Sequence, residues 1–215
     1  MMHGAPEGFT RILREEACSL GMELTDQAVW LAQKHAALLF QWRTRMNLLS
    51  FQDLRELVRR HFLESFVAAQ LLPPSGLAPT RLLDIGGGAG FPGLAMRAVR
   101  PDVELTVLEP RARRAQFLAA VAATQPRPVP RILACNLSSV ASERGWDSAC
   151  FRAVVVRASE LLPRLAPHAV VLTFPGRNAS TDATSRMLAS ARMTRGECRE
   201  LPDRGRLVVA WHRPG

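Results

Sequence analysis

Residues 7–72 carry apolar side chains at the spacing of amphipathic helices. Between residues 24 and 46 an apolar residue recurs every three or four positions, and Thr25 stands where the N-cap of such a helix belongs. A second stripe of the same spacing runs from about Asp53 to Leu72. We therefore expect an N-terminal segment built of helices.

The pattern changes after Pro73-Pro74-Ser75-Gly76, a run that interrupts a helix. Short apolar runs then alternate with helical stretches, which predicts an α/β domain with a mostly parallel sheet and helices on both faces. We expect a helical segment over 1–75 that packs on a Rossmann-like domain over 76–215. The last apolar run has no helix after it, and we expect it to pair antiparallel with 197–201. Strands are predicted at 81–85, 104–108, 131–134, 152–156, 168–174 and 206–212, and helices at 92–99, 111–123, 137–144, 158–165 and 180–193.

A glycine-rich turn follows the first predicted strand, in the sequence RLLDIGGGAGFPG. A strand that ends in glycines before a helix lets backbone amides approach a ligand closely, because no Cβ blocks them. We expect this turn to hold a cofactor. Among its glycines we single out Gly86, Gly88, Gly90 and Gly93.

Two carboxylates bear on which cofactor the turn holds. Glu109 follows the second predicted strand, at about the spacing from the glycines where an acid binds ribose hydroxyls. Residues 88–93 also satisfy the dinucleotide pattern G-x-G-x-x-G, so NAD has to be weighed. Asp84 is poorly placed beside a pyrophosphate, whereas it suits the cationic ammonium and sulfonium groups of S-adenosylmethionine. We therefore favour S-adenosylmethionine over NAD, and place a purely structural turn third.

Residues after the other predicted strands are further candidates, because ligands of open α/β sheets bind beyond the carboxyl ends of the strands. Cys135 and Asn136 follow the third predicted strand, where Asn136 would serve equally well as a helix N-cap. Arg157 follows the fourth, where it could contact a cofactor carboxylate or a substrate phosphate, or be solvated. Phe91 could pack beside the cofactor or belong to the core.

Charge points to a polyanionic partner. The chain has 215 residues, 47% of them hydrophobic, so it can bury a full core. Its net charge is +9, and the basic surplus lies entirely after Ser75, in the part that holds the glycine turn. Arg111, Arg113 and Arg114 open a predicted helix, where the helix dipole disfavours cations. Contact with RNA phosphates explains this cluster better than helix stability does, although an exposed polar face is the ordinary alternative.

Location and metal content are inferred from what the sequence lacks. No apolar run approaches the roughly 20 residues that span a bilayer, and the start has no basic flank before an apolar segment. We expect a cytoplasmic protein without membrane association. The four cysteines form no C-x-x-C pair, so neither a metal site nor a disulfide framework is expected.

Several segments, in order along nearly the whole chain, resemble the RsmG/GidB family of bacterial methyltransferases, which modify N7 of a guanine in 16S ribosomal RNA. The resemblance implies a class I S-adenosylmethionine-dependent methyltransferase fold, S-adenosylmethionine as cofactor, and 16S ribosomal RNA or the small ribosomal subunit as partner. We expect a monomer. The segments are NLLS at 47–50, RHFLES at 60–65, LLDIGGGAGFPGLAM at 82–96, RARRAQFL at 111–118, VVVRA at 154–158 and RLVVA at 206–210.

The resemblance also implies site residues. Where the family carries a lysine before a glycine after the fifth strand, this chain has Thr173-Phe174-Pro175-Gly176-Arg177, and Arg177 is the candidate replacement. Our own candidates on the substrate side are Asn47, Arg60, His61, Glu64 and Arg157. His61 lies on the apolar stripe of its predicted helix, so a buried histidine that links the helices to the pocket is the alternative for it. The cofactor pocket implied by the family consists of Gly86, Gly88, Phe91, Cys135, Asn136 and Arg157, to which our interpretation adds Asp84, Gly90 and Glu109.

Methylation of guanine N7 requires no general base, because N7 already presents an in-plane lone pair. Rate would come from alignment of the reacting atoms in a dry pocket. The guanine has to be unpaired, since N7 lies in the deep major groove of RNA. Two alternatives stay open, namely a methyltransferase of the same fold with another substrate, and an RNA-binding homologue that has lost catalysis.

Overall fold

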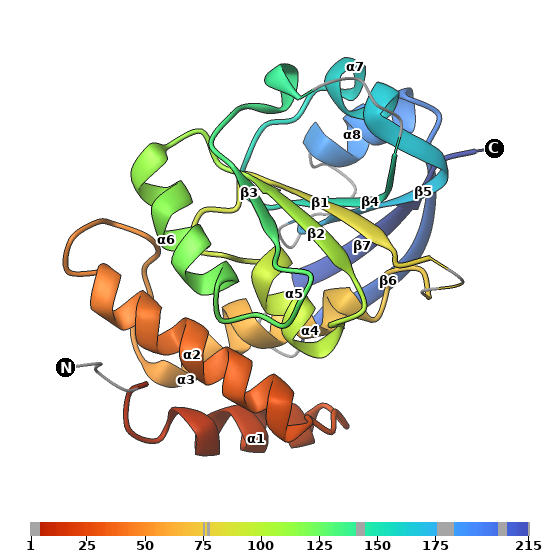
Figure 1. The fold of residues 1–215 in the computed structure, drawn as a ribbon. Helices are drawn as coiled ribbons and strands as arrows, with labels where there is room; N and C mark the ends of the chain where they lie inside the picture. Colours follow the sequence, from red (N-terminus) through yellow and green to blue (C-terminus); the bar gives the residue numbers. More distant parts are fainter. Residues whose placement is uncertain are drawn as a thin grey trace.

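The centre of the molecule is a mostly parallel sheet, shown in Figure 1 as a computed structural model. The structure describes residues 5–74, 76, 78–140, 145–175, 183–201 and 206–214. Within them, strands follow the order β3-β2-β1-β4-β5-β7-β6. The first five strands run parallel, whereas β7 is antiparallel to both β5 and β6. The predicted α/β architecture is confirmed.

The strands and helices have the following bounds. The strands are β1 (Arg81–Ile85), β2 (Glu104–Leu108), β3 (Arg131–Leu133), β4 (Trp146–Phe151), β5 (Leu165–Thr173), β6 (Thr194–Leu201) and β7 (Arg206–His212). The α-helices are α1 (Phe9–Ser19), α2 (Asp26–Trp42), α3 (Leu54–Leu57), α4 (Glu64–Ala69), α5 (Gly93–Val99), α6 (Ala112–Ala122), α7 (Ala158–Leu161) and α8 (Ala183–Ser190). A π-helical turn, η1 (Val58–Leu63), joins α3 to α4, and the 3₁₀ turns are η2 (Leu137–Ser139) and η3 (Leu162–Arg164).

The fourth strand was predicted at 152–156, and this prediction is wrong because β4 ends at Phe151. The run Val154-Val155-Val156 has the β-branched composition of a strand. However, Ala153 has a φ of 56° and Val155 is 98% exposed, so the chain has already left the sheet. The side chains that β4 buries between β1 and β5 include a serine and a cysteine, which a search for apolar runs passes over.

The carboxyl-terminal antiparallel pairing is confirmed, with one difference. β7 lies between β5 and β6, so β6 rather than β7 is the edge strand. The helix predicted at 158–165 is shorter, because α7 ends at Leu161, η3 follows, and β5 begins at Leu165. The helix predicted at 137–144 begins as η2, and residues 141–144 lie outside the described part of the chain.

The N-terminal helices pack on one face of the sheet, against α5 and α6 (Figure 1). Thr25 caps α2 as predicted, because its side chain accepts a hydrogen bond from the amide of Ala28 at 3.1 Å. The segment predicted as one helix from Asp53 is instead α3, η1 and α4 in succession. One continuous apolar cluster joins both parts of the chain. It includes Phe9, Leu39, Phe62 and Phe66 from the helical segment and Leu94, Phe117 and Leu118 from α5 and α6.

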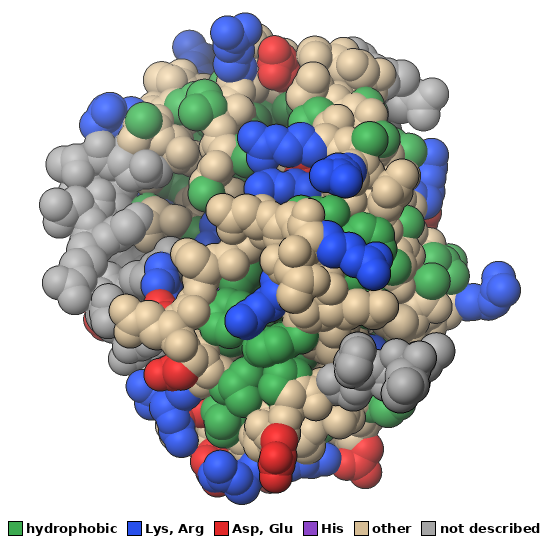
Figure 2. All heavy atoms as spheres, turned by 90° about the vertical axis from the view of Figure 1, so that its left-hand side faces the viewer, with side chains coloured by type: hydrophobic (Ala, Val, Ile, Leu, Met, Phe, Trp, Pro, Cys, Tyr) green, Lys and Arg blue, Asp and Glu red, His purple; other side chains and the backbone are tan. Residues whose placement is uncertain are grey.

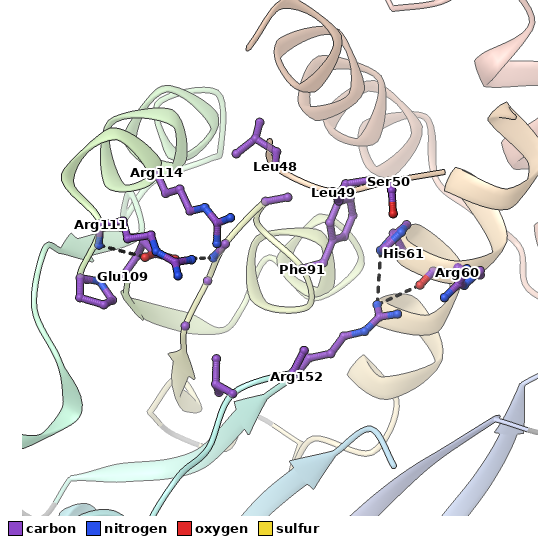
Figure 3. Close-up of a pocket in the computed structure, with 17 residues that line it drawn as sticks. Leu48, Leu49, Ser50, Arg60, His61, Phe91, Glu109, Arg111, Arg114 and Arg152 are labelled. Atoms are coloured by element: carbon purple, nitrogen blue, oxygen red, sulfur yellow. Dashed lines mark hydrogen bonds between the residues drawn. The ribbon is translucent and has the colours of Figure 1, made fainter. Parts of the chain in front are cut away.

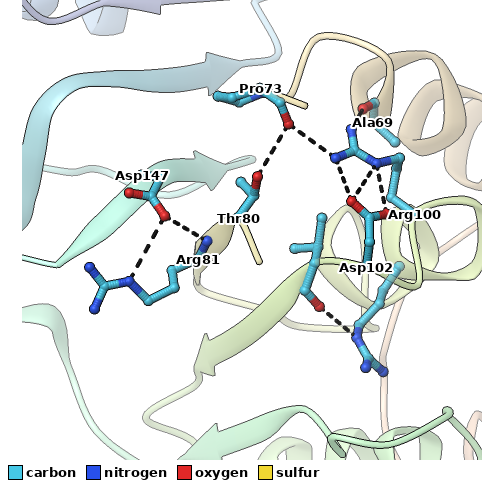
Figure 4. Close-up of polar contacts among 9 residues, drawn as sticks. Ala69, Pro73, Thr80, Arg81, Arg100, Asp102 and Asp147 are labelled. Atoms are coloured by element: carbon cyan, nitrogen blue, oxygen red, sulfur yellow. Dashed lines mark hydrogen bonds and ion pairs between the residues drawn. The ribbon is translucent and has the colours of Figure 1, made fainter. Parts of the chain in front are cut away.

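Polar contacts fix the connection between the helical segment and the sheet (Figure 4). The carbonyl of Pro73 accepts hydrogen bonds from Arg100 Nη2 at 3.0 Å and from Thr80 Oγ1 at 3.2 Å. Arg100 also pairs with Asp102 at 2.7 Å. These contacts hold the segment after α4 against the end of α5, so the helices are fixed relative to β1.

Within the described ranges, none of the helices combines the length and the hydropathy that a membrane span requires.

Candidate functional site

A cavity of about 610 Å³ opens at the carboxyl ends of β1, β2 and β4 (Figure 3). This size is typical of small-molecule sites. One half is lined by the glycine turn and by the residues that follow β2, and the other half by the N-terminal segment and the loop after β4. The lining residues are 48–50, Arg60, His61, 86–89, Phe91, 109–111, Arg114 and 152–154.

The glycine turn is held tightly between β2 and the loop after β4. Gly86 has a φ of 80°, and a Cβ at this position would lie 2.6 Å from Cγ1 of Val154. A Cβ at Gly87 would lie 2.2 Å from Cγ1 of Val107. Both amides donate to the carbonyl of Leu108, at 2.8 and 3.0 Å. Because side chains are excluded here, the backbone itself forms the wall of the cavity.

Glu109 lines the cavity and is 3% exposed. Its Oε2 accepts a hydrogen bond from the amide of Gly88, and its Oε1 accepts one from the amide of Arg111, both at 3.0 Å. Each carboxylate oxygen can accept more than one hydrogen bond, so Glu109 retains capacity for a pair of hydroxyl groups. Glu109 therefore both fixes the turn and fits the role predicted for it.

Asp84 does not line the cavity, which corrects the sequence-based argument. It is fully buried, and its Oδ2 accepts a hydrogen bond from the amide of Gly93 at 3.0 Å. Burial raises the pKa of Asp84 to about 7, while hydrogen bonds from Gly93 and Cys150 oppose that rise. The carboxyl group thus anchors the first turn of α5 beneath the glycines. The argument against NAD relied on Asp84 facing the ligand, and the structure removes that basis.

His35 supports the glycine turn from α2, a contact that the sequence did not reveal. Its ring is 1% exposed, Nε2 lies 2.8 Å from the carbonyl oxygen of Ala89, and the imidazole stacks on Phe91. Burial lowers the pKa of His35 to about 4, although the hydrogen bond to Ala89 opposes this shift. Nε2 carries the proton, since a carbonyl oxygen can only accept. Gly90 packs on this ring, because a Cβ there would lie 2.8 Å from His35, and Gly90 does not line the cavity.

Three residues predicted near the cofactor lie away from the cavity. Cys135 is half-buried in a second apolar cluster, and Asn136 is exposed at the N-cap position of η2 without a side-chain capping bond. The Arg157 side chain is 78% exposed and lies 3.8 Å from Glu160. Arg157 was a candidate because the fourth strand was predicted to end at residue 156. The strand ends at Phe151, so the arginine that directly follows it is Arg152.

Some of the candidates for binding substrate and RNA line the cavity, and others do not. Arg60 and His61 line the cavity, as do Arg111 and Arg114. Arg113 is exposed on α6 outside the lining, and Arg177 lies outside the described residues. Asn47 is exposed, and its contribution is a backbone carbonyl that accepts a hydrogen bond from Arg114 Nη2 at 3.0 Å.

Arg152 is the functional candidate that sequence reasoning missed. It lines the cavity directly after β4, and Figure 3 shows it reaching toward His61 and the backbone of Arg60. Its Nη1 donates to the carbonyl of Arg60 at 2.9 Å, and its Nη2 lies 2.8 Å from Oε2 of Glu64. Its signal is its place directly after a parallel strand, and the predicted strand at 152–156 concealed that place.

The surroundings of the cavity are basic. Among the described residues, four arginines line it against one acidic residue, Glu109. Arg60 and Arg152 are paired with Glu56 and Glu64, so Arg111 and Arg114 carry the basic charge that faces a ligand. Figure 2 shows the side of the molecule where α2 and α6 lie in Figure 1, and basic side chains gather in the upper half of that face. Most acidic side chains in this view lie toward the lower edge. This charge distribution favours a polyanionic ligand beside the cavity.

Comparison with solved structures confirms the predicted class I methyltransferase fold. Magnesium protoporphyrin IX methyltransferase from Synechocystis PCC 6803, solved with bound SAM, matches with a TM-score of 0.60 at 11% identity over 89% of this chain and 98% of that chain. The N-methyltransferase NodS from Bradyrhizobium japonicum WM9, in complex with S-adenosyl-L-homocysteine, matches with a TM-score of 0.55 at 14% identity over 97% of this chain and 100% of that chain.

Comparison with curated proteins and with family models identifies relatives in sequence. A ribosomal RNA small subunit methyltransferase G from Roseiflexus castenholzii is 39% identical over 107 residues, which are 50% of this chain and 44% of that protein. One from Chromobacterium violaceum is 29% identical over 144 residues, 67% of each chain. The matched part thus spans about half the length of the first relatives. The family model described as rRNA small subunit methyltransferase G matches residues 29–193, so this chain belongs to the GidB family.

Proposed function

We propose that this protein is an S-adenosylmethionine-dependent methyltransferase that modifies N7 of a guanine in small-subunit ribosomal RNA. The observation that carries the proposal is the two-sided cavity. One side offers the glycine turn and Glu109, and the other offers His61 and arginines contributed by separate segments. Membership of the GidB family supports this choice of reaction and substrate.

The glycine side of the cavity fits the proposed cofactor. Backbone groups at 86–88 would meet the cofactor closely, because these three glycines line the cavity without side chains. Glu109 would accept the ribose hydroxyls with the lone pairs that its two backbone contacts leave. The bound cofactor supplies a methyl group on a cationic sulfur. Solved structures of this fold with SAM or S-adenosyl-L-homocysteine support the assignment.

The half of the cavity that would hold the substrate has to align guanine N7, which is a nucleophile without further activation. Guanine N7 needs no deprotonation, so the chain's task is to hold the base in line with the methyl group and to exclude water. Phe91 lies between the two halves of the cavity, with His61 and Leu49 beside it (Figure 3). We propose that these three side chains flank the target base.

Two of the arginines around the cavity, Arg111 and Arg114, would bind the RNA backbone. Arg111 is exposed, and Arg114 is half-buried with its guanidinium at the cavity. Phosphate contacts of this kind give affinity that depends on salt and not on sequence. We propose an unpaired segment of 16S ribosomal RNA, free or in the small subunit, as the partner, and a monomeric cytoplasmic enzyme.

The proposal is tested with small subunits from a bacterial strain that lacks this methylation. We expect methyl transfer from labelled S-adenosylmethionine, and 7-methylguanine detected by chemical cleavage at one position of 16S ribosomal RNA. Calorimetry with S-adenosylmethionine and with NADH tests the cofactor. Binding of NADH alone would overturn the cofactor assignment. Binding of S-adenosylmethionine without methylation of subunits or free RNA would favour another substrate or a protein without catalytic activity.

A further inference from the structure

Arg152 connects the end of β4 to a single turn of the N-terminal segment. Its Nη1 donates to the carbonyl of Arg60 at 2.9 Å and lies 3.4 Å from Nδ1 of His61. Its Nη2 lies 2.8 Å from Oε2 of Glu64. Arg60 and His61 belong to η1, and Glu64 is the first residue of α4. One guanidinium therefore holds three neighbouring residues that are far from it in sequence.

The environment of Arg152 is that of a structural arginine and not of a phosphate-binding one. Its side chain is 13% exposed, and that of Glu64 is 2% exposed. A planar guanidinium paired with a buried carboxylate has its charge compensated and its orientation fixed. Arg111, in contrast, lies exposed at the opposite side of the cavity. The two arginines thus have different tasks at the same cavity.

The turn that Arg152 holds has an unusual geometry. η1 is π-helical over six residues, a rare geometry that occurs frequently at functional sites. Phe62 and Leu63 on this turn are buried, whereas His61 lines the cavity, with its ring centroid 5.1 Å from that of Phe91. A guanidinium has only donors, so the His61 Nδ1 that faces Arg152 is an acceptor and the ring proton is on Nε2.

We propose that Arg152 is a positioning residue: it fixes η1 against the carboxyl end of β4 and thereby places the His61 imidazole at the substrate half of the cavity. The inference rests on the proposed function, since His61 is taken to flank the target base. Arg152 itself makes no contact with the base or with a phosphate in this assignment. Its loss affects alignment, which acts on turnover more than on binding.

The test measures methylation of unmodified small subunits by Arg152→Lys, Arg152→Gln, His61→Ala and the Gln/Ala double variant. Lysine keeps a positive charge beside Glu64, but it lacks the planar guanidinium whose second nitrogen donates to the Arg60 carbonyl. We expect both Arg152 variants to lower kcat about 10- to 100-fold, with KM for the subunit and Kd for S-adenosylmethionine within about threefold of wild type. The double variant should lose no more than the larger single loss, because Arg152 acts through His61. Arg131→Gln, an exposed arginine at the start of β3, is the matched control.

Two results would overturn the assignment. Losses that multiply in the double variant would mean that Arg152 acts independently of His61. A raised KM together with a flatter salt dependence of RNA binding would make Arg152 a phosphate contact. Thermal unfolding of each variant identifies a general loss of structure. If Arg152→Gln is unfolded, the kinetic constants of Arg152→Lys decide the test. If the wild-type protein methylates no RNA, the proposed function is refuted and not the role of Arg152. The variants are compared only with an active wild type.

Discussion

The His35 imidazole stacks on the Phe91 ring, with 4.7 Å between the ring centroids and 17° between the planes. Phe91 lines the cavity, whereas His35 is buried behind it and bonded to the carbonyl of Ala89. α2 therefore supports the glycine turn directly. The helical segment and the sheet are coupled through this stack as well as through Arg152.

Stability should depend on pH through His35. The pKa of this imidazole is about 4 in the folded protein and 6.5 as its ordinary value. Between these values the unfolded chain binds a proton that the folded protein does not, so the His35 contribution to the free energy of unfolding falls as pH falls. The full effect is on the order of 3 kcal/mol. Urea unfolding from pH 7.5 to 4.5 should show a smaller loss toward low pH for His35→Gln than for wild type. Parallel curves for the two proteins would contradict the prediction.

Asp84 should act in the opposite direction. Its ordinary pKa is 3.8 and its folded value is about 7, so the folded protein binds the additional proton between these limits. The Asp84 contribution to stability therefore falls as pH rises through this window. In an Asp84→Asn variant, the side-chain amide oxygen can still accept from Gly93, and the group cannot ionise. We expect Asp84→Asn to be as stable as wild type or more stable at pH 8, by urea unfolding.

The same Asp84→Asn variant tests where this side chain lies. Because Asp84 does not line the cavity, calorimetry should give a Kd for S-adenosylmethionine within about twofold of wild type. A loss of affinity greater than tenfold would restore the direct contact that the sequence suggested.

Local pattern was sufficient to predict the strand, turn and helix around the glycines. β1 and β2 lie where the apolar runs are, and α5 and α6 begin within one residue of their predicted starts. Such elements depend on side-chain periodicity and on glycine and proline, which a single sequence displays. The direction of the Asp84 side chain could not be predicted in this way. Alternation along a strand assigns residues to two faces of the sheet, but it does not indicate which face meets a ligand.

The rest of the site could not be predicted because it depends on contacts between distant segments. Arg152 meets Glu64 only when the fold brings the residue after β4 to the start of α4. His35 appeared as one more position in the buried stripe of α2, and nothing local marks its partner as Phe91. β4 was missed because it is a central strand, paired on both sides, that buries Ser148 and Cys150. This burial depends on the packed fold and not on the run of residues itself.

Loss of the Glu109 carboxylate should weaken cofactor binding specifically. Glu109→Ala removes the acceptor for the amides of Gly88 and Arg111 as well as the proposed acceptor for the ribose. Hydrogen bonds to charged groups contribute about 1.5–3 kcal/mol each, so we expect Kd for S-adenosylmethionine to rise at least tenfold by calorimetry. Glu104→Gln, at the amino end of β2, the strand that Glu109 follows, is the matched control and should bind normally. Equal affinities for Glu109→Ala and the control would exclude Glu109 from the cofactor site.

The arginines on α6 should differ in their effect on RNA binding. Arg114 lines the cavity and holds the Asn47 carbonyl, whereas Arg113 lies outside the lining. Each phosphate contact contributes about 0.7 to the slope of log K against log salt for single-stranded RNA. We expect Arg114→Gln to reduce this slope by nearly that amount, and Arg113→Gln to reduce it less. Fluorescence anisotropy with a labelled single-stranded RNA over a range of salt concentrations measures both. Unchanged slopes for both variants would show that these arginines do not contact RNA phosphates and belong to an ordinary solvated helix face.

Gly86 should be intolerant of even the smallest side chain, for two separable reasons. Its φ of 80° costs a non-glycine residue about 1–3 kcal/mol, and the added Cβ would lie 2.6 Å from Val154 Cγ1. Gly86→Ala should therefore lower stability and displace the turn that lines the cavity. Val154→Ala removes the colliding methyl group, so the Gly86→Ala/Val154→Ala double variant should recover part of the loss but not the part due to φ. Unfolding free energies from urea titrations and the Kd for S-adenosylmethionine measure both parts. If the two substitutions were simply additive, the collision with Val154 would not be the cause, and backbone conformation alone would account for the requirement for glycine.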